Sequence, residues 1–184
     1  MTRRYWFWKP YADFVARLRV PSGFVLLAAF AYLSAPDTKS LAYGSPVAVL
    51  GLLLRAWAAG HLAKNEQLAE GGPYAHLRNP LYLGTLLVAA GLAASSRSLL
   101  LALIFAVFFV FVYLPVIELE EQHLRKIFPS YESYAERVPL LWPRLSAASS
   151  GASFRWSLYL RNQEYQALAG FLAAVALLVW KAYR

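Results

Sequence analysis

Apolar residues gather into runs along this 184-residue chain, and short stretches rich in charge, glycine and proline separate the runs. The five runs cover residues 20–36, 46–63, 80–94, 98–117 and 165–180. A helix needs about 20 apolar residues to cross a bilayer, and lipid-exposed backbone must satisfy its hydrogen bonds internally. The pattern therefore predicts an all-α, polytopic membrane bundle of about five transmembrane helices.

The whole chain, residues 1–184, is interpreted as one integral membrane domain. Its parts are an interfacial N-terminal segment at 1–19, a four-span core at 20–144, and an additional C-terminal interfacial segment and span at 154–184. The basic, aromatic start MTRRYWFWKP is similar to a signal peptide, but the apolar run after it ends without a small-residue cleavage site. We interpret that run as a retained first span.

Lysine and arginine flank the apolar runs, and the net charge is +8. By the positive-inside rule, the N-terminus and the loops at 64–79 and 118–144 are cytoplasmic, and the C-terminus lies on the opposite face. This explains the basic charge better than nucleic-acid binding does. The chain has no cysteine, and its histidines lack ligand spacing, so we expect no metal; membrane lipids are the expected surroundings.

Four residues within the runs carry structural expectations. Gly84 and Gly91 are spaced for close contact with another helix. Pro115 is expected to kink the fourth run. Arg55 interrupts the second run, and it either faces the bundle or extends its charge towards one end; we favour the second alternative.

The stretch GGPYAHLRNPLYLG, which joins the second and third runs, contains the first candidate site. Asn79 is predicted to be the N-cap and Pro80 the first residue of a helix. The free amides of Leu81 and Tyr82, with Arg78 beside them, suit a small anion. The alternative is an ordinary loop before a well-capped transmembrane helix.

A second candidate site follows the fourth run, where Glu118, Glu120 and Glu121 occur within four residues. A tight hairpin between the third and fourth runs brings them near Arg78. They form either a solvated, ion-paired helix end or a negative pocket that faces Arg78, and the hairpin favours the pocket for Glu120 or Glu121. Glu121 has Arg125 four residues away, so we predict that Glu120 turns towards the loop.

These motifs recur in a fixed order, and a tail rich in tyrosine follows them. The residues that carry the pattern are Gly72, Pro73 and Tyr74, then Arg78 to Gly84, then Glu120 and Glu121, then Phe128, Tyr131, Tyr134, Val138 and Pro139. The pattern resembles the membrane methyltransferases of the isoprenylcysteine carboxyl methyltransferase and phospholipid N-methyltransferase superfamily. Asn79 stands where that family has histidine, and the fifth run is extra to the four-span core.

The resemblance implies S-adenosylmethionine as cofactor, with S-adenosylhomocysteine as product. It implies cofactor binding by Gly72, Tyr74, His76, Leu77, Arg78, Asn79, Pro80, Tyr82, Glu120 and Glu121, with Arg78 and Glu121 also catalytic. The chemistry agrees: the cofactor's carboxylate suits Arg78, its amino group suits a glutamate, and its sulfonium suits a carboxylate or aromatic faces.

The methyl acceptor is expected to be lipophilic and to enter from the membrane, either as a prenylated-cysteine-like carboxylate or as a phospholipid amine. Lys64, Asn65 and Glu164 border the spans, and we predict that some of them meet its head group. One alternative function is an NADPH-dependent membrane reductase of the sterol-reductase type, although its nucleotide needs more basic residues than this loop offers. The other is a small lipid-binding membrane protein without activity.

Overall fold

The computed structural model describes residues 6–144 and 153–184, and this part of the chain is helical without strands. The long elements are α1 (Lys9–Leu33), α2 (Thr38–Ala59), α3 (Pro80–Ser96), α8 (Tyr165–Ala182), and α4 (Leu99–Phe108), which continues through the π-helical η2 (Phe109–Tyr113) into α5 (Leu114–Ile127). The short elements are η1 (Gly72–Ala75), α6 (Tyr131–Arg137) and α7 (Trp156–Arg161). By length and composition, α1, α2, the continuous α4–η2–α5 helix and α8 can each cross a membrane, and α3 is a shorter apolar helix of 17 residues. The predicted all-α membrane bundle is confirmed.

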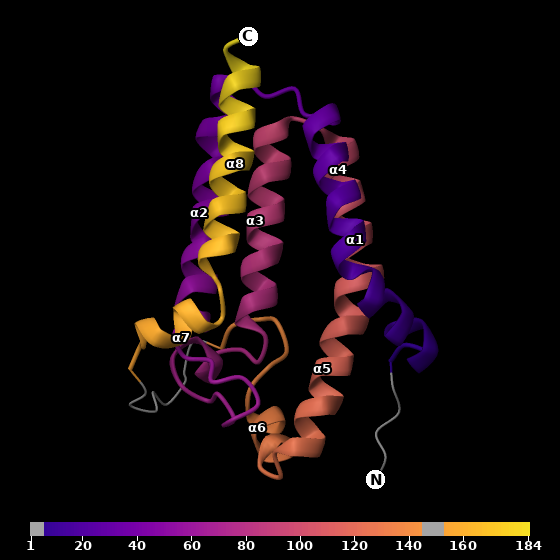
Figure 1. Ribbon diagram of the computed structural model, residues 1–184, viewed down its shortest axis with the longest axis vertical. Coiled ribbons are helices and arrows are strands. Elements are labelled where there is room, and N and C mark those ends of the chain that lie inside the picture. Colours follow the sequence, from indigo (N-terminus) through magenta and orange to yellow (C-terminus); the bar gives the residue numbers. More distant parts are fainter. Residues whose placement is uncertain (1–5, 145–152) are drawn as a thin grey trace.

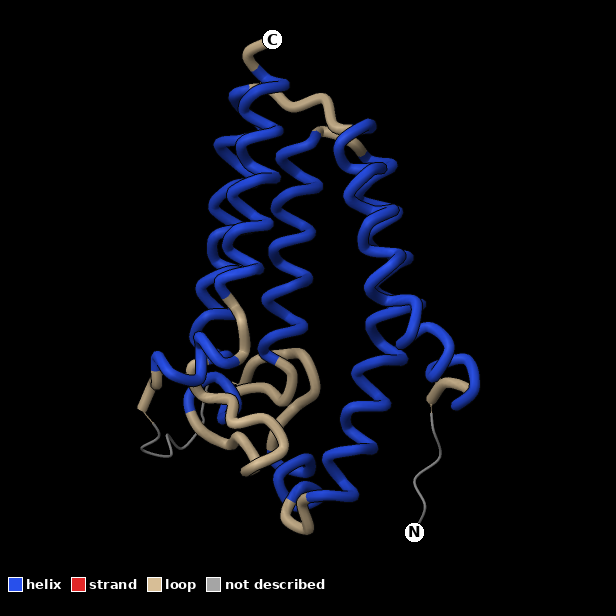
Figure 2. The backbone as a smooth tube through the Cα atoms, in the orientation of Figure 1, coloured by secondary structure: helices blue, strands red, loops and turns tan. Residues whose placement is uncertain are grey.

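The long helices form two groups that diverge towards one end of the molecule (Figure 1). One group contains α2, α3 and α8, and the other contains α1 and the α4–η2–α5 helix. Loops, η1, α6 and α7 gather at the divergent end, which we call the loop end (Figure 2). Helix α1 begins at the loop end and α8 finishes at the opposite end, as five passes through a bilayer require.

Small residues allow α2 and α3 to pack with their backbones in contact. A Cβ atom added to Gly91 would lie 2.4 Å from the Ala48 nitrogen, and one added to Gly84 would lie 2.7 Å from the Gly51 carbonyl oxygen. Both distances are too short for a side chain, so the predicted role of Gly84 and Gly91 in close helix contact is confirmed.

The disturbance predicted at Pro115 takes the form of the π-helical segment η2, which ends just before it. Proline has no N–H, so the Phe111 carbonyl, four residues earlier, loses its usual helical donor. The Tyr11 hydroxyl of α1 donates to that carbonyl at 2.6 Å. The carbonyl that Pro115 leaves without a helical donor thus accepts a hydrogen bond that joins α1 to the α4–η2–α5 helix.

The described chain is part of the bundle from its start at residue 6. Residues 9–19, predicted to be interfacial, are the first turns of the same helix that forms the first span, and they are angled away from its remainder (Figure 1). Just before them, the amides of Trp6 and Phe7 donate to the two carboxylate oxygens of Glu118 in α5, at 2.5 and 2.9 Å. Glu118 therefore anchors the start of α1 and is not available to the candidate site.

The C-terminal helix closes the opposite end. The Lys181 ammonium group donates to the carbonyl oxygens of Ala31 (2.8 Å) and Ser34 (2.6 Å) at the end of α1, where a cation complements the helix dipole. Below this contact lies an apolar cluster of Phe30, Leu101, Ala174 and Leu178. Helix α8 is therefore integrated into the bundle and joins its two groups.

The orientation of the bundle is a prediction that cysteine labelling can test, because the chain contains no native cysteine. Thr38 and Gln67 are both exposed, at the opposite end and in the loop region respectively. We expect a membrane-impermeant thiol reagent to label a Gln67→Cys variant only from the cytoplasmic side and a Thr38→Cys variant only from the outer side. Labelling of both from one side would contradict the five-pass topology.

Candidate active site

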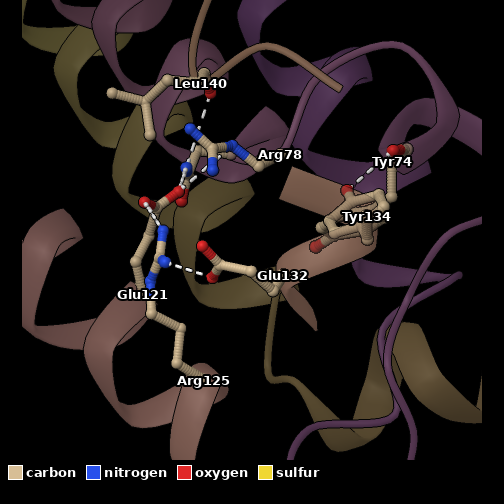
Figure 3. A network of polar contacts seen from close by, with 8 residues as sticks. Tyr74, Arg78, Glu121, Arg125, Glu132, Tyr134 and Leu140 are labelled. Carbon is tan, nitrogen blue, oxygen red and sulfur yellow. Dashed lines mark hydrogen bonds and ion pairs between the residues drawn. The ribbon is translucent and has the colours of Figure 1, made fainter. Parts of the chain in front are cut away.

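The loop before α3 meets α5 through an ion-paired cluster at the loop end (Figure 3). Arg78 Nε lies 3.3 Å from Glu121 Oε1, and Arg125 Nη2 lies 3.8 Å from Glu121 Oε2. The side chains of Arg78 and Glu121 are only 11% and 7% exposed, so the pair is largely removed from water. The predicted meeting of an α5 glutamate with Arg78 is confirmed.

The prediction for the two adjacent glutamates was right for Glu120 and incomplete for Glu121. Glu120 turns towards the loop stretch and accepts a hydrogen bond from the Tyr82 hydroxyl at 2.8 Å, but Glu121 is the one that faces Arg78. The predicted pair of Glu121 with Arg125 exists, but one carboxylate has two oxygens and here bridges two arginines. A partner within the helix therefore does not exclude a second partner across the hairpin.

Asn79 also departs from its predicted role. Helix α3 begins at Pro80 as predicted, but the Asn79 side chain makes no cap hydrogen bond. Its Nδ2 lies 3.5 Å from Glu121 Oε1 and 3.4 Å from the Leu140 carbonyl oxygen. The Tyr82 amide is not free either, because it donates to the Asn79 carbonyl at 3.1 Å. Arg78, rather than the helix start, therefore remains the candidate for binding an anion.

The segment after α6 lines the back of the loop through backbone hydrogen bonds. The Arg78 amide donates to the Pro139 carbonyl, and the Arg144 amide donates to the His76 carbonyl, both at 2.9 Å. His76 Nδ1 in turn lies 2.7 Å from the Arg144 carbonyl oxygen. The segment after α6 thus fixes the backbone position of Arg78.

Buried tyrosines join α6 to the same loop. The Tyr134 hydroxyl donates to the Tyr74 carbonyl at 2.8 Å (Figure 3). Burial raises the pKa of Tyr74, Tyr131 and Tyr134 well above the usual value, so all three phenols stay protonated at neutral pH. Tyr134 therefore remains a donor, and the loop keeps its support across the physiological pH range.

Gly72 is required by its backbone conformation and by its neighbour. Its φ of +56° lies in the left-handed region, and an added Cβ would lie 2.6 Å from the His61 ring. Leu77 and Pro80, two further predicted cofactor residues, are buried and shape the loop from inside.

Arg55 does not extend towards solvent, so that expectation was wrong. Its Nε and Nη2 bind the two carboxylate oxygens of Glu164 at 2.5 and 3.0 Å, and its Nη1 lies 2.5 Å from Thr85 Oγ1. The predicted head-group residue Glu164 is thus buried in an ion pair. The other two predicted head-group residues, Lys64 and Asn65, are exposed in a turn.

Sequence reasoning missed the Arg55–Glu164 pair and the role of Glu118. The first had a usable signal, since a cation inside one span and a carboxylate at the start of another are natural partners. Glu118 had none, because its partners are backbone amides far away in the chain.

Residues 42–131 match the model of the phospholipid methyltransferase family. This segment contains most of α2, the loop, α3 and the α4–η2–α5 helix, with Arg78, Glu121 and Arg125. Over this segment the chain is similar to the phospholipid methyltransferase family, in agreement with the superfamily that its motifs resemble.

Two curated proteins are similar to part of the chain. Cobalt-zinc-cadmium resistance protein CzcN of Cupriavidus metallidurans is 39% identical over 94 residues, covering 50% of this chain and 44% of that protein. Nickel-cobalt-cadmium resistance protein NccN of Alcaligenes xylosoxydans xylosoxydans is 35% identical over 114 residues, covering 59% and 54%. The chain spans about half the length of these relatives. No solved structure matches it.

Proposed function

We propose that this chain transfers a methyl group from S-adenosylmethionine to a lipophilic acceptor at the cytoplasmic membrane face. The observation that carries the proposal is the unequal environment of two adjacent acids. Glu121 is neutralised by Arg78 and Arg125, whereas Glu120 receives only the Tyr82 hydroxyl and makes no ion pair within residues 6–144 and 153–184. A carboxylate without a cation, on the residue before the glutamate that pairs with Arg78, suits a ligand that carries both charges.

The residues present fit the cofactor. Its carboxylate matches Arg78, whose Nε is buried and makes an ion pair but no hydrogen bond among the described residues. Its ammonium or sulfonium matches Glu120, with the ring of Tyr82 beside that carboxylate. The proposed binding residues are Gly72, Tyr74, His76, Leu77, Arg78, Asn79, Pro80, Tyr82, Glu120 and Glu121. When bound, adenosylmethionine supplies an electrophilic methyl group for a single in-line displacement.

In this proposal the chain acts mainly by positioning. Arg78 binds and orients the ligand carboxylate, and Glu121 holds Arg78 in place. Glu120 compensates positive charge in a partly desolvated setting, where an uncompensated charge is costly. Precise orientation supplies much of the rate enhancement of a displacement, so few reacting groups are needed.

The acceptor decides whether a base is also required. A carboxylate acceptor needs none, whereas a phospholipid amine must lose a proton, which a glutamate of the site would take. Lys64 and Asn65 remain candidates for contact with the acceptor's head group. The relatives are named for metal resistance, and our proposal of a lipophilic acceptor rests instead on the match to the phospholipid methyltransferase family.

Methyl transfer can be measured directly. The purified chain, reconstituted in lipid, is incubated with methyl-labelled adenosylmethionine, and label is counted in the organic extract. We expect time-dependent labelling of the extract that a Glu120→Gln variant largely loses. Saturable NADPH binding without any labelling would instead favour the reductase alternative.

The two glutamates are expected to respond differently to loss of charge. Glu120→Gln should weaken adenosylmethionine binding about tenfold, the scale of one charged hydrogen bond, because no other acid faces the ligand's cation. Glu121→Gln should lower the thermal midpoint more, since it leaves two arginines with reduced compensation. Calorimetric titration and thermal unfolding of both variants test this. Equal losses of affinity would contradict the assignment.

A further inference from the structure

An apolar cavity of about 290 Å³ lies between the two groups of helices. Its walls come from α1, α3, α4, η2 and α8, and include Leu27, Leu92 and Phe105. Phe30 and Ala174 belong both to this lining and to the apolar cluster around Leu178, so the cavity adjoins that cluster. A space of this shape and polarity suits a hydrocarbon chain.

Two glycines face this space without filling it. A Cβ atom added to Gly23 of α1 or to Gly170 of α8 would meet no atom within 4 Å, and both residues line the cavity. They contrast with Gly84 and Gly91, where an added Cβ would strike the backbone of α2. Gly23 and Gly170 therefore keep open space rather than allow close helix packing.

The cavity adjoins the candidate active site. Tyr113 lines it and packs edge to face against Tyr82, with ring centroids 5.8 Å apart. Tyr82 in turn donates to Glu120. Thr85, one turn further along α3, also lines the cavity. A molecule lying in the cavity would therefore have one end against Tyr113 and Tyr82.

One charged residue, Arg19 of α1, belongs to the lining. It precedes the other α1 residues of the lining, so it lies nearest the loop end, where α1 begins. A guanidinium there favours an anionic group on the bound molecule, either a carboxylate or a phosphate. Both groups occur on membrane amphiphiles.

We infer that this cavity holds the apolar tail of the methyl acceptor, an amphiphile with an anionic carboxylate or phosphate group, and that Gly23 and Gly170 set the bulk of the tail that it admits. The inference rests on the proposed function. Both glycines and Arg19 lie outside the family-matched segment 42–131. In this inference, residues outside the segment shared with the family determine which acceptor this chain prefers.

Photo-crosslinking tests the inference without relying on activity. The reconstituted protein is exposed to a diazirine-bearing C16 fatty acid or to phosphatidylethanolamine with the same group on one chain, and mass spectrometry locates the labelled residues. We expect labelling of cavity residues on α1, α4 and α8 by at least one probe. Labelling by the fatty acid alone identifies a carboxylate ligand, and labelling by the phospholipid identifies a phosphate.

Matched variants give the test its specificity. Gly170→Leu and Gly23→Leu should each reduce cavity labelling about tenfold by filling the space. Gly170→Ala controls for helix propensity, and Ala173→Leu, at an exposed position of α8 outside the lining, controls for added bulk; both should label like the wild type.

Arg19→Gln should weaken probe binding about tenfold, whereas Arg17→Gln, exposed and outside the lining, should leave it unchanged.

Adenosylmethionine binding to the same samples separates the two proposals. Cavity labelling that Gly170→Leu abolishes, in a protein that does not bind adenosylmethionine, would uphold the tail site and reject the methyltransferase function. Adenosylmethionine binding with labels only on outward-facing residues, or cavity labelling unaffected by either leucine, would overturn the tail site and leave the function standing.

Discussion

An Arg78→Lys variant is expected to bind adenosylmethionine roughly ten- to a hundredfold more weakly than the wild type, a loss of about 1.5–3 kcal/mol. Lysine keeps the charge but loses the planar fork that holds Glu121 on one side and a ligand carboxylate on another. The Arg78 amide is already fixed by Pro139, so the backbone should stay in place and the loss should reflect the side chain alone. Calorimetric titration in detergent measures it.

Arg125→Lys is the matched control. Arg125 also pairs with Glu121, but its second partner is Glu132 of α6 at 2.5 Å (Figure 3). We expect lower stability and nearly unchanged affinity. A folded Arg78→Lys variant with wild-type affinity would remove Arg78 from the binding site.

A Glu164→Gln variant is expected to lose about 3–5 kcal/mol of unfolding free energy, the usual result when one partner of a buried ion pair is removed. Arg55 is 22% exposed and Glu164 7%, so little water is present to replace the lost carboxylate. The pair also joins α8 to Thr85 of α3, so its loss loosens the C-terminal helix. Chemical unfolding in detergent gives the free energy.

Two further variants separate the ion pair from general damage. Glu66→Gln removes the exposed pair with Arg161 and should change stability little, because water screens surface charges. A double variant, Arg55→Met with Glu164→Leu, should recover much of the loss, since apolar side chains of similar volume can replace a buried pair. An equally unstable double variant would mean that the arginine has a role beyond pairing.

Much of the architecture was predictable because membrane helices are specified locally. Apolar runs located the spans, and Gly84 and Gly91 identified a packed surface that the structure places against α2. The meeting of Arg78 with the acids of α5 was also predictable, since one tight hairpin joins the segments that carry them.

The remaining features depend on helix rotation and on contacts distant in sequence. Which of two adjacent glutamates meets Arg78 is set by the rotation of α5, and the i+4 partner Arg125 gave a misleading answer. Arg55 pairs with Glu164, 109 residues away in the sequence, and only the assembly of α2, α3 and α8 brings the two side chains together. The Asn79 side chain contacts Glu121 and the Leu140 carbonyl instead of capping its own helix, because folding brings those acceptors beside it.

The most direct test of the account is equilibrium binding of adenosylmethionine to the purified, folded chain. We predict saturable binding at one site, competition by S-adenosylhomocysteine but not by NADPH, and a clear loss of affinity in Glu120→Gln but not in Arg125→Lys. Absence of saturable binding by protein that unfolds cooperatively, or displacement of the ligand by NADPH, would contradict the proposal that the Arg78–Glu120–Glu121 site serves methyl transfer.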